Sequence, residues 1–113
     1  MRLRSDIWVA AYIRRCEIEG ASAVLRRRGA AEAGAIFVKI DWLDGRAALY
    51  GPAPQALVDE PGLDRVFARM HAQECIEVGD AEARLRREIG FDPDVWIVEV
   101  EDRQGRRWLD VIA

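Results

Sequence analysis

The sequence contains few of the side chains that most often ligate metals or act as nucleophiles. It has one histidine, His71, and two cysteines, Cys16 and Cys75. A zinc site normally needs three or four protein ligands, and beside His71 and Cys75 only Cys16 is left as a soft donor. No glycine-rich phosphate loop, serine-centred nucleophile motif or paired CxxC pattern occurs in the sequence. The signatures of the common enzyme classes are therefore missing.

The sequence also lacks a long apolar run, a linker and an internal repeat. The apolar stretch over residues 7–13 ends at Arg14 and Arg15 and is too short and too polar to span a membrane. No signal-peptide cleavage pattern follows it. We therefore expect a single domain over residues 1–113, located in the cytoplasm, with no membrane partner and with both cysteines reduced.

Lysine is nearly absent, because Lys39 is the only lysine among 17 basic residues and the rest are arginines. This bias is typical of a GC-rich bacterial genome, although arginine also suits bidentate contacts with carboxylate or phosphate. The net charge of −3 argues against a general nucleic-acid binder, which is usually basic. A content of 50% hydrophobic and 33% charged residues is that of a folded domain.

The N-terminal segment is predicted to be helical. Ser5 or Asp6 can cap a helix that runs to about Glu19, where Gly20 suits a left-handed exit. The apolar residues of this segment roughly follow helical spacing. A strand over residues 7–13 is the alternative.

Strands are predicted in both halves of the chain, from alternation of apolar and polar residues and from enrichment in β-forming residues. The predicted strands are 21–28, 35–42, 46–50, 95–102 and 106–112. Asp44-Gly45 predicts a type I′ turn between the second and third strands, and a short glycine-containing turn joins the last two. These turns define two hairpins.

The middle of the chain is predicted to be helical. Residues 61–76 carry an apolar stripe, and a second helix runs from Ala81 to about Ile89. The sum is an α+β fold: an antiparallel sheet of two hairpins plus an extra strand, with two to three helices packed on one face. We expect the tryptophans to be mostly buried, with an aromatic cluster at a ligand pocket as the alternative. They are Trp8, Trp42, Trp96 and Trp108.

Four segments together resemble one family over nearly the whole chain. They are Ser5-Asp6-Ile7-Trp8-Val9, Ala35-Ile36-Phe37-Val38-Lys39, the run from Leu49 to Pro54, and the run from Phe91 to Arg103. The sequence resembles short alphaproteobacterial proteins grouped as domain of unknown function 1491. The resemblance implies a lineage and a domain size, but no activity, cofactor or catalytic residue.

An acidic group near the C-terminus is a candidate metal site. Glu99 and Glu101 lie two apart on a predicted strand, so their carboxylates share a face, and Asp94 lies upstream. Oxygen ligands of this kind bind divalent cations. The alternative is a solvated sheet face whose carboxylates pair with basic residues across the strands.

Three further features are candidates for binding. Arginine clusters can form a positive patch for phosphate or an acidic partner, although nearby glutamates can neutralise it. These clusters contain Arg26, Arg27, Arg28, Arg84 and Arg87. A rigid loop with Tyr50, Pro52 and Pro54 follows a strand, where binding sites are common. His71 and Cys75 are spaced i, i+4, which on a helix would place both on one face.

The sequence does not identify a reaction, and we predict neither a catalytic residue nor a cofactor. The favoured hypothesis is a small protein-interaction module that binds a protein partner or forms a homodimer through an exposed edge strand. Residues 106–112 or 21–28 would supply that edge. A metal-dependent hydrolase using Asp94, Glu99 and Glu101 is the alternative, and nucleic-acid or phosphate binding through the arginines is a weaker one.

Overall fold

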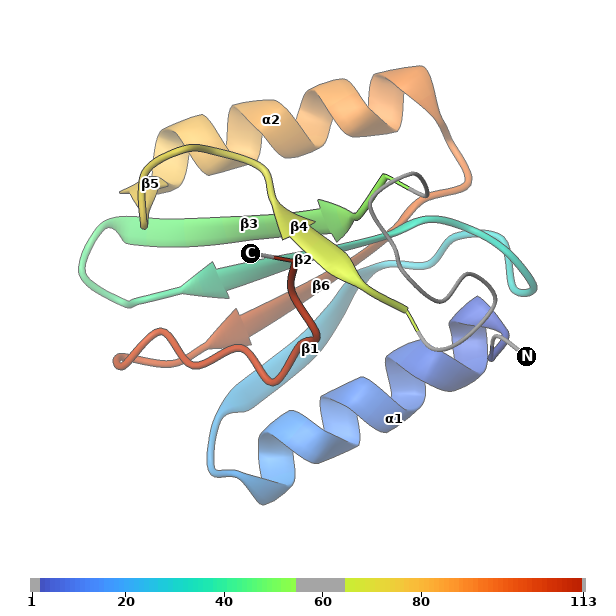
Figure 1. Cartoon of the computed structure of the whole chain (residues 1–113), viewed down its shortest axis with the longest axis horizontal. Helices are drawn as coiled ribbons and strands as arrows, with labels where there is room; N and C mark the ends of the chain where they lie inside the picture. Colours follow the sequence, from blue (N-terminus) through green and yellow to red (C-terminus); the bar gives the residue numbers. More distant parts are fainter. Residues whose placement is uncertain (1–2, 55–64, 113) are drawn as a thin grey trace.

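The computed structural model describes residues 3–54 and 65–112, which form two helices and a six-stranded sheet. In chain order the elements are α1 (Ser5–Ile18), β1 (Ser22–Arg27), β2 (Ile36–Asp41), β3 (Arg46–Pro52), β4 (Phe67–Arg69), β5 (Ile76–Glu77), α2 (Val78–Phe91) and β6 (Trp96–Glu101) (Figure 1). The α+β class predicted from the sequence is confirmed. Neither helix in this part of the chain has the length and apolar character needed to cross a membrane.

The sheet is mixed, in the order β1-β6-β2-β3-β4, with β5 paired to β3. The last strand, β6, lies between β1, to which it is antiparallel, and β2, to which it is parallel. The prediction of a wholly antiparallel sheet is therefore wrong at this pairing. Trp96, Ile97 and Val98 of β6 are all buried, so the strand is apolar on both faces, as expected of a central strand.

Only the first of the two predicted hairpins is present. β2 and β3 pair antiparallel, but residues 106–112 do not return beside β6 as a strand. Both edges of β6 already pair with β1 and β2, so no hydrogen-bonding edge is left for the C-terminal segment, residues 103–112. That segment crosses instead to β4, where Phe67 and Val111 form an isolated parallel bridge. Of the two segments predicted to be edge strands, only residues 21–28 contain one, which is β1.

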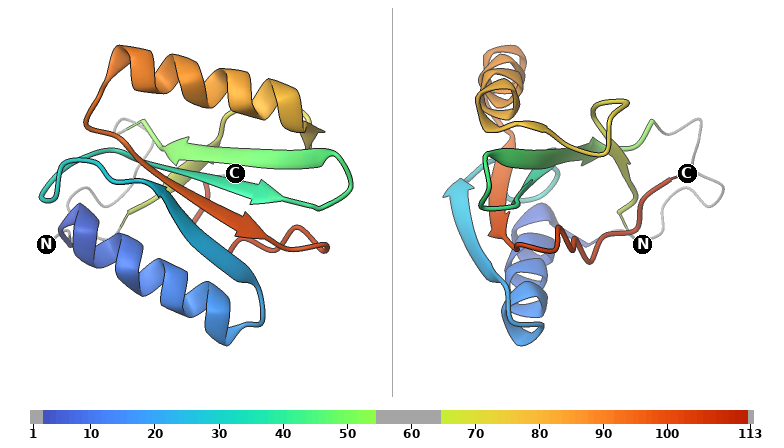
Figure 2. Two further views of the ribbon diagram at one scale, coloured as in Figure 1. Left: turned by 180° about the vertical axis from the view of Figure 1, so that it is seen from behind. Right: turned by 90° about the vertical axis from the view of Figure 1, so that its left-hand side faces the viewer.

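The two helices pack on opposite faces of the sheet, whereas the sequence predicted helices on one face. Alternation along β2 divides its side chains between two apolar clusters. Val38 packs with Val9 and Tyr12 of α1, and Phe37 packs with Leu85 of α2. α1 contacts β1 and β6, while α2 contacts β2, β3 and β5 (Figures 1 and 2). The apolar residues on both faces of β2 and β6 need this second layer.

The prediction of a helix over residues 61–76 is wrong for residues 65–76, which the structure describes. Residues 65–77 form the short strands β4 and β5 joined by a loop, and residues 61–64 lie outside the described part. Phe67 is buried against the α1 face, and the Met70 amide donates to the Leu49 carbonyl at 3.0 Å. The apolar stripe therefore reflects contacts at the sheet edge. α2 itself is longer than predicted and continues through Gly79 and Gly90.

Two local predictions are also corrected. Neither Ser5 nor Asp6 caps α1, because the N-cap residue is Arg4 and it makes no side-chain cap bond. A type I′ turn at Asp44-Gly45 would need positive φ at Asp44 and at Gly45. The β2–β3 turn instead has positive φ at Leu43 (62°) and Gly45 (88°). The hairpin exists, but its loop has a different conformation.

Candidate binding site

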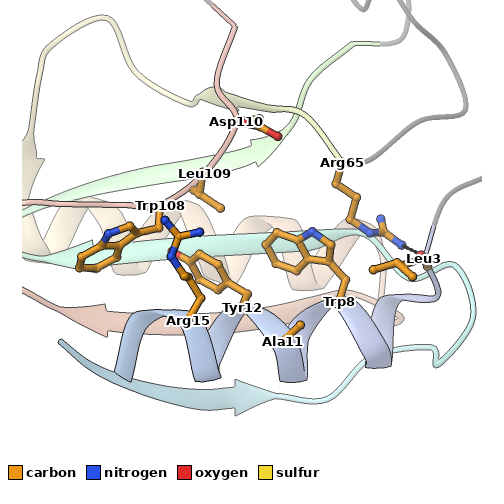
Figure 3. Close-up of a pocket in the computed structure, with 9 residues that line it drawn as sticks. All are labelled: Leu3, Trp8, Ala11, Tyr12, Arg15, Arg65, Trp108, Leu109 and Asp110. Carbon is orange, nitrogen blue, oxygen red and sulfur yellow. Dashed lines mark hydrogen bonds between the residues drawn. The ribbon is translucent and has the colours of Figure 1, made fainter. Parts of the chain in front are cut away.

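A groove of about 430 Å³ opens between α1 and the C-terminal segment (Figure 3). We call it the aromatic groove. The residues that matter to its chemistry are Trp8, Ala11, Tyr12, Arg15, Arg65 and Trp108. It joins elements from the two ends of the chain, because α1 supplies one wall and the C-terminal segment supplies the other.

The α1 wall is a stack of aromatic rings. Trp8 and Tyr12 are one helical turn apart, and their ring centroids lie 4.9 Å apart with planes 15° from parallel. On its other side Trp8 contacts Phe67, with centroids 5.2 Å apart. The buried Tyr12 hydroxyl donates to the Arg107 carbonyl oxygen at 2.6 Å. This bond attaches α1 directly to the C-terminal segment.

Tyr12 stays protonated, mainly because burial raises the pKa of its hydroxyl far above the usual value for tyrosine. It is therefore a permanent hydrogen-bond donor to the C-terminal segment. Its ring contributes to the wall of the groove, whereas its hydroxyl is committed to structure.

Trp108 forms the facing wall and has an unusual backbone conformation. Its φ of 48° lies in the left-handed region, which non-glycine residues rarely adopt. Flanking backbone bonds hold this conformation: the Phe67 amide donates to the Asp110 carbonyl at 2.8 Å, and the Ile112 amide donates to the Phe67 carbonyl at 2.9 Å. The Arg106 guanidinium lies 5.0 Å from the indole centroid. Trp108 lies at one end of the groove, near Arg15 and Tyr12 (Figure 3).

Positive charge borders these rings. The Arg15 side chain is 59% exposed and forms an ion pair with Glu19 at 3.6 Å, which is weak because both side chains are largely exposed to solvent. Arg65 is buried and donates to the Leu3 carbonyl and to the Ser5 hydroxyl, the latter at 2.9 Å. Asp110 is the acidic residue of the lining. The groove can thus hold an apolar or aromatic group with a carboxylate near Arg15.

The prediction that the tryptophans are mostly buried is confirmed. Trp96 is 1% exposed, and Trp8, Trp42 and Trp108 are partly buried against the apolar cluster on the α1 face. Two of these three line the aromatic groove, in line with the alternative of an aromatic cluster at a pocket. The i, i+4 spacing of Trp8 and Tyr12 was the sequence signal for one wall. No local signal joined Trp108 to them, because that contact depends on the path of the C-terminal segment.

A second cavity, of about 410 Å³, is lined in part by other residues of the C-terminal segment. We call it the basic pocket. Its lining residues are Tyr50, Ala68, Arg69, His71, Arg107, Val111 and Ile112. Tyr50, predicted as a binding residue, is buried here and lies under the Arg107 guanidinium, 5.5 Å from its ring centroid. Pro52 and Pro54 are exposed residues outside this lining.

His71 is held by backbone groups on both ring nitrogens. The Leu49 amide donates to Nε2 at 3.0 Å, so Nδ1 carries the proton and donates to the Gln73 carbonyl at 2.7 Å. Burial lowers the pKa of His71, which keeps the ring neutral. Residues 71–75 are not helical, so the predicted helical pairing of His71 with Cys75 does not exist. His71 is a structural residue.

The predicted metal residues are not assembled into a metal site. Within residues 3–54 and 65–112, no group of three His, Cys, Asp or Glu side chains is arranged to hold a metal ion. Glu99 instead bonds basic groups, Glu101 is exposed at the end of β6, and Asp94 is exposed in the loop before it. Glu99 therefore agrees with the alternative drawn from the sequence, in which the carboxylates pair with basic residues across the strands.

Glu99 belongs to a cluster of charged groups between the sheet and α2. The ion cluster contains Arg26, Lys39, Asp41, Glu82 and Glu99. The Lys39 ammonium, only 4% exposed, lies 2.8 Å from Glu82, 3.3 Å from Glu99 and 3.7 Å from Asp41. Arg26 binds Glu82 through two hydrogen bonds of 2.8 Å and Glu99 through one of 3.0 Å.

The pKa values of the ion cluster reflect these contacts. The hydrogen bonds from Arg26 and Lys39 lower the pKa of Glu82 to about 2. Burial alone would lower the pKa of Lys39, but its hydrogen bond to Glu82 and the charge of Glu99 raise it above the usual value. Glu82 and Lys39 are therefore charged at neutral pH, and the ion pairs of the cluster attach α2 to β1, β2 and β6.

Most of the predicted arginine clusters are engaged in structural contacts. Arg27 donates to the Pro93 carbonyl at 2.8 Å, and the Arg28 guanidinium lies 5.4 Å from the Trp96 ring centroid. Arg84 donates to the Met70 carbonyl at 2.8 Å. Arg87 is exposed on α2. The arginines that line cavities, Arg15, Arg65, Arg69 and Arg107, lie outside the predicted clusters.

Comparison with known proteins identifies relatives over the whole length of the chain. A crystal structure of a DUF1491 family protein from Caulobacter crescentus is 39% identical, with a TM-score of 0.81 and complete coverage of both chains. A solution structure of an A. tumefaciens protein is 40% identical, with a TM-score of 0.83, and the match covers 99% of this chain and 96% of that one. Among curated proteins, none matches.

The family profile described as "Protein of unknown function (DUF1491)" matches residues 3–110, which agrees with the resemblance drawn from the sequence. The matched region includes both walls of the aromatic groove and the residues that line it up to Asp110. The chain belongs to the DUF1491 family.

Proposed function

We propose that this protein is a small binding module whose aromatic groove takes a short segment of a protein partner. The observation that carries the proposal is the pair of half-buried indoles, Trp8 and Trp108, that face one groove with Arg15 at its rim. Tryptophan, tyrosine and arginine are the residues that contribute most binding energy at protein interfaces. An apolar side chain between the rings and an acidic group beside Arg15 would satisfy this surface.

Other polar side chains that could take part in catalysis already have hydrogen-bond or ion-pair partners within the protein, which supports a binding role over a catalytic one. The ring nitrogens of His71 are both bonded to backbone groups, and Lys39 and Glu99 are bonded to each other and to their neighbours. A general base or nucleophile needs a free position toward a substrate. These groups therefore serve the fold, and the aromatic groove is left for recognition.

A matched pair of alanines on α1 allows a direct test. Ala11 lines the aromatic groove, whereas its neighbour Ala10 is exposed outside that lining. A photoreactive phenylalanine analogue is introduced at one position or the other in the native host, and cross-linked products are identified by mass spectrometry. We expect a defined protein product from position 11 that is absent from position 10 and is lost when Trp108→Ala is added.

Two results would count against the proposal. Equal products from both positions would mean that the groove has no special role, and no product from position 11 would mean that nothing occupies it. A product containing two copies of this chain would identify the partner as the protein itself, which makes the module self-associating.

We infer a cytoplasmic location from the state of the cysteines. Cys16 is fully buried and Cys75 is partly buried, and both are free thiols. Free thiols persist in a reducing compartment. Fractionation of the host, with detection of the tagged protein in each fraction, tests this inference.

A further inference from the structure

The basic pocket contains two arginines that form no ion pair with a carboxylate of residues 3–54 and 65–112, and we propose that it binds the oxyanion group of a small organic acid. Arg69 and Arg107 both line this cavity, and the described residues of its lining include no aspartate or glutamate. The pocket and the aromatic groove share no lining residue, so this ligand and the protein partner would occupy different sites.

The lack of carboxylate partners distinguishes these two arginines from others in the chain. Several arginines form ion pairs within 4.0 Å, namely Arg4, Arg15, Arg26, Arg46 and Arg106. Across residues 3–54 and 65–112, no aspartate or glutamate forms such a pair with Arg69 or Arg107. Two guanidinium groups that line one cavity without an acid attract an anion.

Both arginines are exposed, and each guanidinium already has protein contacts in the absence of a ligand. Arg69 donates through Nε to the His71 carbonyl at 3.1 Å and through Nη2 to the Ala72 carbonyl at 3.0 Å. Arg107 stacks over Tyr50 and donates a long bond of 3.4 Å to its hydroxyl. Each guanidinium has five N–H donors, so both retain donors for an oxyanion. The two bonds that hold Arg69 reduce the entropy that its side chain loses on binding.

The remaining walls indicate what the rest of the ligand is like. Ala68, Val111 and Ile112 provide an apolar surface, and the Tyr50 ring forms part of the floor. His71 is neutral and bonded through both nitrogens, so it adds no charge that would compete with the arginines. A volume of about 410 Å³ suits a small molecule. The pocket therefore fits a compact apolar group that carries one oxyanion.

The test is a titration of the whole protein, followed by amide NMR, with butyrate and separately with inorganic phosphate at constant ionic strength. We expect saturable shifts of amides around Arg69, His71 and Val111, with a midpoint below about 10 mM for at least one probe. Butyrate alone would identify a carboxylate with an apolar tail as the ligand class. Phosphate alone would identify a phosphate group. Shifts that never saturate, or that fall outside the pocket, would overturn the proposal.

Variants separate specific recognition from general attraction. Arg107→Met should weaken binding by about tenfold, because it removes charge-assisted hydrogen bonds, and Arg107→Lys should recover part of the loss. Arg14→Met removes the same charge from an exposed position on α1 outside both cavities and should leave binding unchanged. Thermal melting confirms that each variant is folded, and Arg69→Met replaces Arg107→Met if the latter is not. Equal weakening by Arg14→Met would overturn the proposal.

Discussion

Basic side chains have different surroundings on the two faces of the sheet. On the α2 face, Arg26 and Lys39 lie within 2.8–3.3 Å of the carboxylates of Glu82 and Glu99. On the α1 face, Arg107 lies over the Tyr50 ring, and no described carboxylate forms an ion pair with it. Matched charges at a partly buried interface fix one helix onto the sheet. Unmatched charges beside aromatic rings are available to bind something else.

The comparison predicts that the ion cluster contributes more to stability than any other group of charges described here. Lys39→Met removes the ammonium that three carboxylates share, which leaves them close together and poorly solvated. We expect the free energy of unfolding to fall by about 3 kcal/mol in urea denaturation. Arg46→Met, which breaks an exposed pair with Asp44, is the matched control and should change it little. Equal effects of the two variants would remove the distinction between the faces.

Acid should weaken the same cluster. The folded-state pKa of Glu82 is about 2, below its ordinary value of 4.5, so its contribution is complete above pH 4.5 and is lost as the pH falls toward 2. We expect Glu82 to account for about 2 kcal/mol of the stability lost between pH 6 and pH 2.5, after allowance for partial solvent exposure. Urea denaturation of the wild type and of Glu82→Gln at both pH values measures this share. If the two proteins lose the same stability, the cluster is not the acid-sensitive element.

A smaller effect is expected on the α1 face, at the left-handed Trp108. Alanine removes the indole but keeps the unfavourable backbone conformation, whereas glycine adopts a φ of 48° without strain. Trp108→Gly should therefore be more stable than Trp108→Ala by about 1 kcal/mol. Paired thermal or urea denaturation of the two variants measures the difference. A more stable alanine variant would show that this residue does not keep its left-handed conformation in solution.

The sequence predicted elements that depend on local patterns. The spacing of Ile7, Trp8 and Tyr12 predicted α1, and the alternation around Val38 and Val98 predicted β2 and β6. Local patterns also predicted the β2–β3 hairpin, because its strands are neighbours in the chain. These features need no knowledge of distant contacts.

The features that the sequence did not predict all depend on long-range pairing. Phe37 and Ile97 signalled a second apolar face, but only the pairing of β6 with β1 and β2 shows why both faces must be covered. Phe67 and Met70 have a spacing that suits a helix as well as a sheet edge, so the strand that contains Phe67 was missed. Both cavities depend on the path of residues 106–112, which follows from the lack of a free edge on β6. The candidate site was therefore least predictable where it uses the C-terminal segment.

The strand order has a consequence for synthesis on the ribosome. β1 emerges early, but within the described chain its hydrogen-bonding neighbour is β6, the last strand to be translated. The same strand joins β1 to the β2–β3 hairpin, so the two halves of the sheet are connected only when residues 96–101 have left the exit tunnel. Such distant contacts slow folding. The nascent chain therefore completes its fold late, and until then the edge of β1 that pairs with β6 is open to chaperones.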